Sequence, residues 1–139
     1  AKIQELNFNH PVKYLTAANA SGVNLLGATG GTDNKLKLQI NGTDIADYKF
    51  ANPNFSTVAL YYHTTNGTST VASDSTEKLF LYPFCLETGK LQPTGTLNFS
   101  RLDSARIVND LNNSDDDIYA VNYNVLRIEN GMGGLLYSN

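Results

Sequence analysis

Short runs in which apolar and polar residues alternate recur along the whole chain. In KLKLQI (35–40), three aliphatic residues alternate with lysine and glutamine, so that Leu36, Leu38 and Ile40 share one face. A period of two with charges on one side predicts a half-buried β-strand. Runs of this kind return every ten residues or so, separated by Gly, Asn, Thr and Ser, which predicts an all-β sandwich or barrel in a single domain, residues 1–139.

Three further runs in the first two thirds of the chain predict strands. PVKYLTA (11–17) begins with a proline, which a strand tolerates at its first position. STVALYYH (56–63) places Val58, Leu60 and Tyr62 on one face. KLFLYPFCL (78–86) is almost continuously apolar and is expected to be buried on both sides, with Pro83 at a bulge, a sheet edge or a strand break.

Two more strands are predicted nearer the C-terminus. TLNFSR (96–101) alternates, with Leu97 and Phe99 directed inward and a buried Arg101 at its end. IYAVNYNVLRI (118–128) is the longest candidate. One face carries Tyr119, Val121, Tyr123 and Val125, and the other face carries Ala120, Asn122 and Asn124. The two asparagines need hydrogen-bond partners if that face is covered, because a buried unpaired amide costs about 1–3 kcal/mol.

The segments between these runs predict loops. Residues 21–34 are rich in glycine, 46–55 form an irregular connection, and 63–77 are polar. The only helical signal is one turn at 104–108. In Gln92-Pro93-Thr94-Gly95, Pro and Gly stand where a type I turn prefers them. We therefore expect a rigid corner with an architectural role, since a phosphate-binding loop would also need a lysine and a following helix.

Composition excludes several function classes. The 139 residues carry a net charge of −3, which gives no basic patch for nucleic acid. No apolar run approaches the length of a transmembrane helix, so no membrane insertion is expected. Charged residues make up only 17% of the chain, which favours surfaces that are covered by partners. The chain begins abruptly at Ala1 without an initiator Met, which suggests a fragment or a processed product.

Residues capable of catalysis or metal binding are present without a supporting pattern. Ser21, Ser100 and Ser104 lack the nucleophile-elbow motif, and His10 and His63 have no flanking signature. The three acids Asp115–Asp117 lack the spaced frame of a calcium loop, so a solvated surface is expected. We therefore predict no catalytic, cofactor-binding or metal site, and no enzyme activity.

The remaining candidates concern structure and modification. Cys85 lies between Phe84 and Leu86 and is expected to be an inert, buried thiol. Arg101 and Arg106 flank Asp103. Arg101 is expected either to pair with an acid such as Asp103 or to make a contact across a subunit interface. Glycosylation sequons begin at six positions: Asn19, Asn41, Asn54, Asn66, Asn98 and Asn112. Asn98 lies inside the predicted strand 96–101 and is therefore the least suited to carry a glycan.

Three segments resemble the major capsid proteins of the nucleocytoplasmic large DNA viruses, a family that includes the iridoviruses and phycodnaviruses. They are NFNHPVKYL (7–15), YPFCLETGKLQPTGTLNFSRLDSARI (82–107) and YAVNYNVLRIENGMGGLLYSN (119–139). QPTGTLNFSR is similar to the family signature Q-P-S-G-x-x-N-F-S-R, with Thr94 in place of serine. The ending resembles the family's extreme C-terminus. One departure is Ala17, where the family commonly carries tryptophan.

The resemblance implies an eight-stranded antiparallel jelly roll, the second half of a double jelly roll whose first half precedes this chain. It also implies a structural protein of the virion that forms homotrimeric capsomers of pseudo-hexagonal outline in an icosahedral capsid. Neighbouring capsomers and minor capsid proteins are the implied partners, and the host cytoplasm is the implied site of synthesis and assembly. We further expect part of the subunit contact to come from residues 131–139, where Gly133 and Gly134 allow close backbone approach.

One rival interpretation stays open, a carbohydrate-binding jelly-roll module. Eight tyrosines and many Asn and Asp residues favour it. The absence of tryptophan, a favoured platform for stacking on sugars, and the lack of a calcium frame speak against it.

Overall fold

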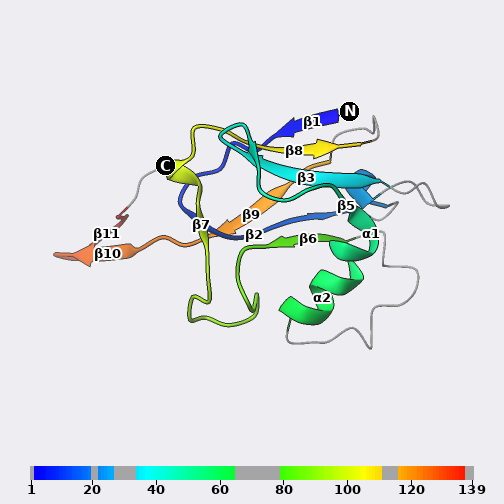
Figure 1. Ribbon diagram of the computed structural model, residues 1–139. Coiled ribbons are helices and arrows are strands. Elements are labelled where there is room, and N and C mark those ends of the chain that lie inside the picture. Colours follow the sequence, from blue (N-terminus) through cyan, green and yellow to red (C-terminus); the bar gives the residue numbers. More distant parts are fainter. Residues whose placement is uncertain (1, 20–21, 27–33, 65–78, 111–115, 137–139) are drawn as a thin grey trace.

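The computed structural model describes residues 2–19, 22–26, 34–64, 79–110 and 116–136 of the chain. Two antiparallel sheets face each other, two short helices lie beside the second sheet, and a separate hairpin projects from one end (Figure 1). The all-β prediction is therefore confirmed, and the helices are the main departure from it.

The first sheet has the strand order β1-β8-β3-β4, with β5 also paired to β3. Its longest pairing joins β3 and β8, in which Leu38 lies opposite Ile107. The strand predicted at 35–40 is confirmed as β3, and its Leu36 and Leu38 are buried. The strands of this sheet are β1 (Lys2–Glu5), β3 (Lys35–Ile40), β4 (Thr43–Asp44), β5 (Lys49–Phe50) and β8 (Ala105–Asn109).

The second sheet is built around β2, which pairs with β6 and β7 along one side and with β9 along the other. The register with β9 shifts between Val12 and Tyr14, and this irregularity lets Val12 and Leu15 both reach the core. The strand predicted at 11–17 is thus confirmed. The strand predicted at 78–86 is confirmed over 79–83 and ends at Pro83. The strands of this sheet are β2 (Pro11–Ala18), β6 (Leu79–Pro83), β7 (Leu97–Asn98) and β9 (Tyr119–Asn122).

The core fills the space between the two sheets. Leu36 and Ile107 from the first sheet and Leu15 and Phe80 from the second are fully buried there. The rings of Phe55 and Tyr82 stack at a centroid distance of 4.7 Å and extend this core toward the helices. As expected, β6 is buried on both faces in its middle, since Phe80 belongs to the main core and Leu81 packs under a helix.

The strand predicted at 56–63 is wrong, because this segment forms helix α2 (Thr57–His63), which follows the short helix α1 (Ala51–Asn54). Helix α1 and strand β5 also depart from the prediction that 46–55 is irregular. The buried side chains Phe55 and Ala59, and likewise Ser56 and Leu60, are four residues apart, which is helical spacing. Ala59 and Leu60 pack onto Leu81 of β6, so the helix covers the outer face of the second sheet.

Two other local predictions are corrected. The helical turn predicted at 104–108 is the strand β8, in which Ile107 and Val108 suit a strand better than a helix. The strand predicted at 96–101 ends after β7, because the side chain of Asn98 accepts a hydrogen bond from the backbone N–H of Ser100 and starts a 3-10 turn, Phe99–Arg101. Leu97 packs against the core and Phe99 is buried, so their inward direction is confirmed. Arg101 is exposed rather than buried.

The loop predicted at 21–34 contains a 3-10 turn (Asn24–Leu26) within its described part. The carboxylate of Asp116 accepts hydrogen bonds from the backbone N–H groups of Asn24 and Leu25, at 3.1 and 2.7 Å. Asp116 is therefore a structural residue and not only a solvated acid, while Asp117 is exposed and Asp115 lies outside the described residues. The rest of this loop, the segment 65–78 and residues 111–114 also lie outside them.

Candidate assembly surface

The C-terminal end of the described chain forms a two-stranded hairpin, β10 (Leu126–Glu129) and β11 (Met132–Leu135), joined at Asn130 and Gly131. Both joining residues have positive φ, 51° and 76°, as the tightest hairpin turn requires. The predicted strand 118–128 is therefore two strands, with a break after Asn122. An Asn-Gly pair between apolar residues is the sequence signal that would have identified this hairpin.

The hairpin stands away from both sheets, as Figure 1 shows, and every residue of its two strands is exposed. Six of its apolar side chains are between 47% and 75% exposed: Val125, Leu126, Ile128, Met132, Leu135 and Leu136. An isolated two-stranded hairpin is at best marginally stable in water. A projecting hairpin with this much apolar surface is typical of an element that a partner covers.

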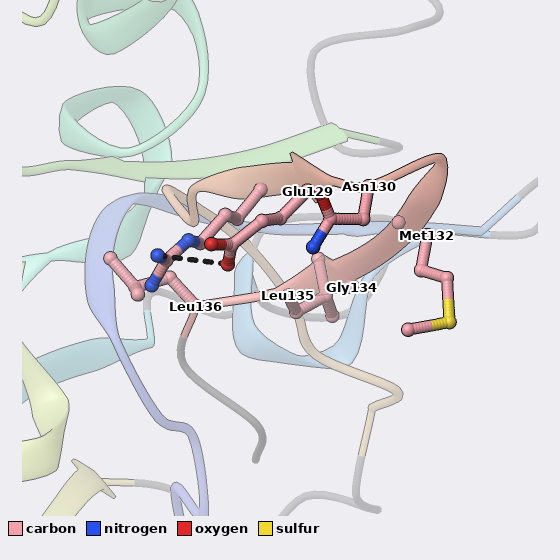
Figure 2. Close-up of a pocket in the computed structure, with 8 residues that line it drawn as sticks. Glu129, Asn130, Met132, Gly134, Leu135 and Leu136 are labelled. Carbon is pink, nitrogen blue, oxygen red and sulfur yellow. Dashed lines mark ion pairs between the residues drawn. The ribbon is translucent and has the colours of Figure 1, made fainter.

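One side of the hairpin forms an open hollow of about 370 Å³ (Figure 2). Arg127 and Glu129 form an ion pair across it, at 3.0 Å. A β-carbon added at Gly134 would meet nothing within 4 Å, and one at Gly133 would meet only Ile128, at 3.9 Å. Packing within the described part of the chain therefore does not require these glycines, and another backbone has room to approach them.

The outward face of β9 is a second apolar surface. Tyr119 is 61% exposed and Val121 is 40% exposed, whereas Ala120 packs against the core. The alternation alone does not say which face of this strand is inward, and the structure directs Ala120 to the core. Both asparagines of the strand prediction have partners: Asn122 donates to the carbonyl of Asn9, and Asn124 accepts from the N–H of Val125.

A third exposed apolar group lies on α2 and on the connection that follows β6. Tyr61 and Tyr62 of the helix are 57% and 69% exposed, and Leu86 and Leu91 of the connection are 70% and 98% exposed. The two regions are joined through His63, whose Nδ1 lies 3.0 Å from the carbonyl of Cys85 and whose own carbonyl accepts from Thr88. His63 ends helix α2, so its predicted position at the end of a strand is wrong.

The corner predicted at 92–95 has an architectural role, but these described residues form no hydrogen-bonded turn. The Thr94 hydroxyl accepts hydrogen bonds from the backbone N–H groups of Leu86 and Glu87, each at 3.2 Å. Gly95 adopts a φ of 140°, and a β-carbon there would lie 2.8 Å from the carbonyl oxygen of Phe84. These contacts fasten the 92–95 segment to the end of β6.

The other residues considered as chemical candidates are dispersed. Cys85 is buried as expected, and burial raises the pKa of its thiol. His10 is buried with a positive φ of 68°, and its backbone N–H donates to the hydroxyl of Ser100.

Among the described residues, no ion pair joins Arg101 to Asp103, and no group of His, Cys, Asp and Glu side chains could hold a metal ion. Nor does any described helix have the length and apolar character needed to cross a membrane.

Several sequon asparagines use their side chains within the fold. The Oδ1 atom of Asn41 accepts from the N–H groups of Asp103 and Ser104, and the Nδ2 group of Asn54 donates to the Phe50 carbonyl. Asn98 starts the 3-10 turn described above. Asn19 is exposed, and Asn66 and Asn112 lie outside the described residues.

Comparison with known proteins gives one consistent family. Residues 1–134 match the family model described as large eukaryotic DNA virus major capsid protein. The major capsid protein of Pyramimonas orientalis virus is 36% identical over 155 aligned residues, which cover 97% of this chain and 38% of that protein. The major capsid protein of Paramecium bursaria Chlorella virus 1 is 30% identical over 193 aligned residues, which cover 96% of this chain and 42% of that protein.

Solved structures agree with the sequence comparisons. A chain of the PBCV-1 virus capsid superposes with a TM-score of 0.73 at 27% identity, covering 99% of this chain and 46% of that chain. The neighbour is a double jelly roll, so the predicted jelly-roll class is confirmed. This chain thus spans less than half the length of these relatives.

Proposed function

Because this chain belongs to the major capsid protein family of large eukaryotic DNA viruses, we propose that it is the C-terminal jelly roll of a capsid subunit that assembles into homotrimers. The trimers are capsomers of pseudo-hexagonal outline that tile an icosahedral shell together with neighbouring capsomers and minor capsid proteins. Synthesis and assembly take place in the host cytoplasm. The relatives are structural proteins and not enzymes, and they place the family in the virion capsid.

The observation that carries this proposal is the exposed hairpin β10–β11. A soluble monomer rarely keeps a projecting element with six exposed apolar side chains, whereas a subunit that is buried in a shell covers such elements. The outward Tyr119 and Val121 of β9 and the aromatic pair on α2 add further surface for contacts. Low charge is also typical of surfaces that meet sister subunits.

Peptide mapping of purified virus particles tests this proposal. Trypsin releases residues 107–127, IVNDLNNSDDDIYAVNYNVLR, which can be identified by its mass. We expect this peptide in the dominant particle band, at a size far above the 15.1 kDa of this chain. If the peptide comes instead from a minor or non-particle protein of about this size, the shell role is wrong. The carbohydrate-binding alternative then gains weight, and a glycan-binding screen decides it.

A further inference from the structure

Two Asn-Gly pairs in the described part of the chain form hairpin turns with nearly the same backbone. Asn41 and Gly42 join β3 to β4, with φ values of 52° and 80°. Asn130 and Gly131 join β10 to β11, with φ values of 51° and 76°. Both asparagines are exposed, and a β-carbon at either glycine would meet nothing within 4 Å. Backbone conformation and local space therefore do not distinguish the two turns.

The side chains of the two asparagines are held differently. The Oδ1 atom of Asn41 accepts hydrogen bonds from the backbone N–H groups of Asp103 and Ser104, at 2.8 and 3.2 Å. The side chain of Asn130 has no hydrogen-bond partner among the described residues, and it borders the open hollow of the hairpin (Figure 2). The amide of Asn130 is thus free to turn, whereas that of Asn41 is fixed in one orientation.

The surroundings of the two hairpins also differ. β4 pairs with β3 inside the five-stranded sheet, and Asp44 of β4 is bound by the side chains of Lys37 and Gln39. Among the described strands, β10 and β11 pair only with each other, and all their residues are exposed. A two-stranded hairpin without a core is marginally stable, and elements of low local stability open often. The turn at Asn130 should therefore open more often than the turn at Asn41.

An Asn-Gly pair that is free to move reacts with itself. The backbone nitrogen of the glycine attacks Cγ of the asparagine and closes a succinimide ring. The side-chain nitrogen leaves as ammonia, with the proton that the glycine nitrogen gives up. Water then opens the ring at either carbonyl, which leaves aspartate or isoaspartate. Glycine favours the attack because no side chain crowds its nitrogen, and the reaction consumes only water.

We propose that Asn130 is the site of spontaneous deamidation in the folded chain and that Asn41 is protected. The unheld amide and the separate, exposed hairpin favour the reaction at Asn130. The two hydrogen bonds to Oδ1 oppose it at Asn41, because they must break before Cγ turns toward the glycine nitrogen. The argument uses no part of the capsid role, so the two proposals fail independently.

The reaction changes the charge of the hairpin tip. The product carries a new carboxylate next to Glu129, whose own carboxylate is already paired with Arg127. This charge lies between the exposed apolar side chains of Ile128 and Met132. A charge without a partner opposes the burial of such a surface. If the proposed capsid role holds, subunits that age before assembly cover this hairpin less readily than fresh ones.

Timed incubation of the folded chain in weakly alkaline buffer, followed by tryptic peptide mapping, tests the proposal. Trypsin releases Asn130 in residues 128–139, IENGMGGLLYSN, and Asn41 in residues 38–49, LQINGTDIADYK. Deamidation exchanges an amino group for a hydroxyl group, and fragmentation of the peptide assigns the mass change to one residue. We expect the rate at Asn130 to exceed that at Asn41 at least about tenfold, because two hydrogen bonds protect Asn41. Equal rates, or a faster reaction at Asn41, overturn the proposal.

The same incubation in urea separates the effect of the fold from that of the local sequence. Neither asparagine is held in the unfolded chain, so we expect similar rates at the two sites. A difference of the same size in urea would show that the flanking residues set the rates, and the proposal would then be wrong.

Asn130→Gln is the matched control variant, because glutamine keeps the amide but closes the corresponding ring far more slowly. The mass change in residues 128–139 should disappear in this variant, while the rate at Asn41 stays the same. A mass change that persists places the reaction at Asn139 and contradicts the assignment. Failure of the particle peptide-mapping test removes the capsid role and leaves these rates unaffected.

Discussion

Gly95 lies so close to the backbone carbonyl of Phe84 that a β-carbon at position 95 would stand 2.8 Å from that oxygen. Its φ of 140° is also one that residues with side chains rarely adopt. This close approach fixes the segment that leads into β7 against the end of β6.

Gly95→Ala should therefore destabilise the fold. We expect the free energy of unfolding to fall by about 1–3 kcal/mol, from backbone strain and the contact with the Phe84 carbonyl. Urea denaturation followed by circular dichroism measures this change. Gly134→Ala is the matched control, because a β-carbon there meets nothing within 4 Å. Equal denaturation midpoints for the two variants would contradict the close approach.

The hydroxyl of Thr94 makes a separate prediction. Thr94→Val removes the acceptor for the N–H groups of Leu86 and Glu87 while it keeps the shape of the side chain. We expect a loss of about 1 kcal/mol in the free energy of unfolding. Thr94→Ser retains the hydroxyl and should be close to the unmodified chain, which also explains why serine suits this place in the family signature. The hydroxyl has no such role if both variants unfold alike.

Asp116 should stabilise the fold through its two hydrogen bonds to the 3-10 turn. Asp116→Ala is expected to lower the free energy of unfolding by about 1–2 kcal/mol, as the loss of other capping side chains does. Asp117→Ala is the control, since Asp117 is exposed. Thermal melts of the two variants compare them directly, and a larger loss for Asp117→Ala would show that the assignment is wrong.

Cys85 should react slowly in the folded chain. It is 4% exposed, and burial raises the pKa of its thiol. The raised pKa means that its contribution to stability is complete below the ordinary thiol pKa and is lost as the pH rises through the folded-state value. Labelling with iodoacetamide at pH 8, followed by mass spectrometry, should be at least about tenfold slower for the native chain than for the chain in urea. Similar rates would show an accessible thiolate.

Deletion of residues 131–139 should weaken assembly more than folding. Every described residue from Gly131 to Leu136 is exposed, and none of these six belongs to the core. We expect an unchanged urea midpoint, with loss of trimers in analytical ultracentrifugation. Normal capsomers from the truncated chain would rule out a contact through this segment.

Strands whose alternation reflects the core could be predicted from the sequence. β2 and β3 agree with their predictions because their apolar faces are directed at the sandwich interior. The 56–63 segment shows the limit of this reasoning, since Val58, Leu60 and Tyr62 alternate by chance. The packing there is instead set by Phe55 and Ala59, whose spacing is helical.

The candidate assembly surface is harder to predict than the core strands. In a single sequence, apolar residues that face a partner cannot be told from apolar residues that face the core. In β9, the larger residues Tyr119 and Val121 share one face and the smaller Ala120 lies on the other, yet it is Ala120 that packs against the core. The role expected for residues 131–139 stays a prediction, and the structure supports it by showing a hairpin whose apolar side chains have no cover within the described chain.

The pairing of β1 with β8 has a consequence for the order of folding during synthesis. Lys2 lies opposite Asn109, so β1 meets its partner β8 only after the nascent chain has grown by about a hundred further residues. β3 pairs locally with β4 and β5, but its other edge likewise pairs only when β8 is made. Contacts this distant in sequence form slowly, because a long loop must close before they are gained. The nascent chain thus carries unpaired strand edges for most of its translation, and chaperones are expected to bind it there.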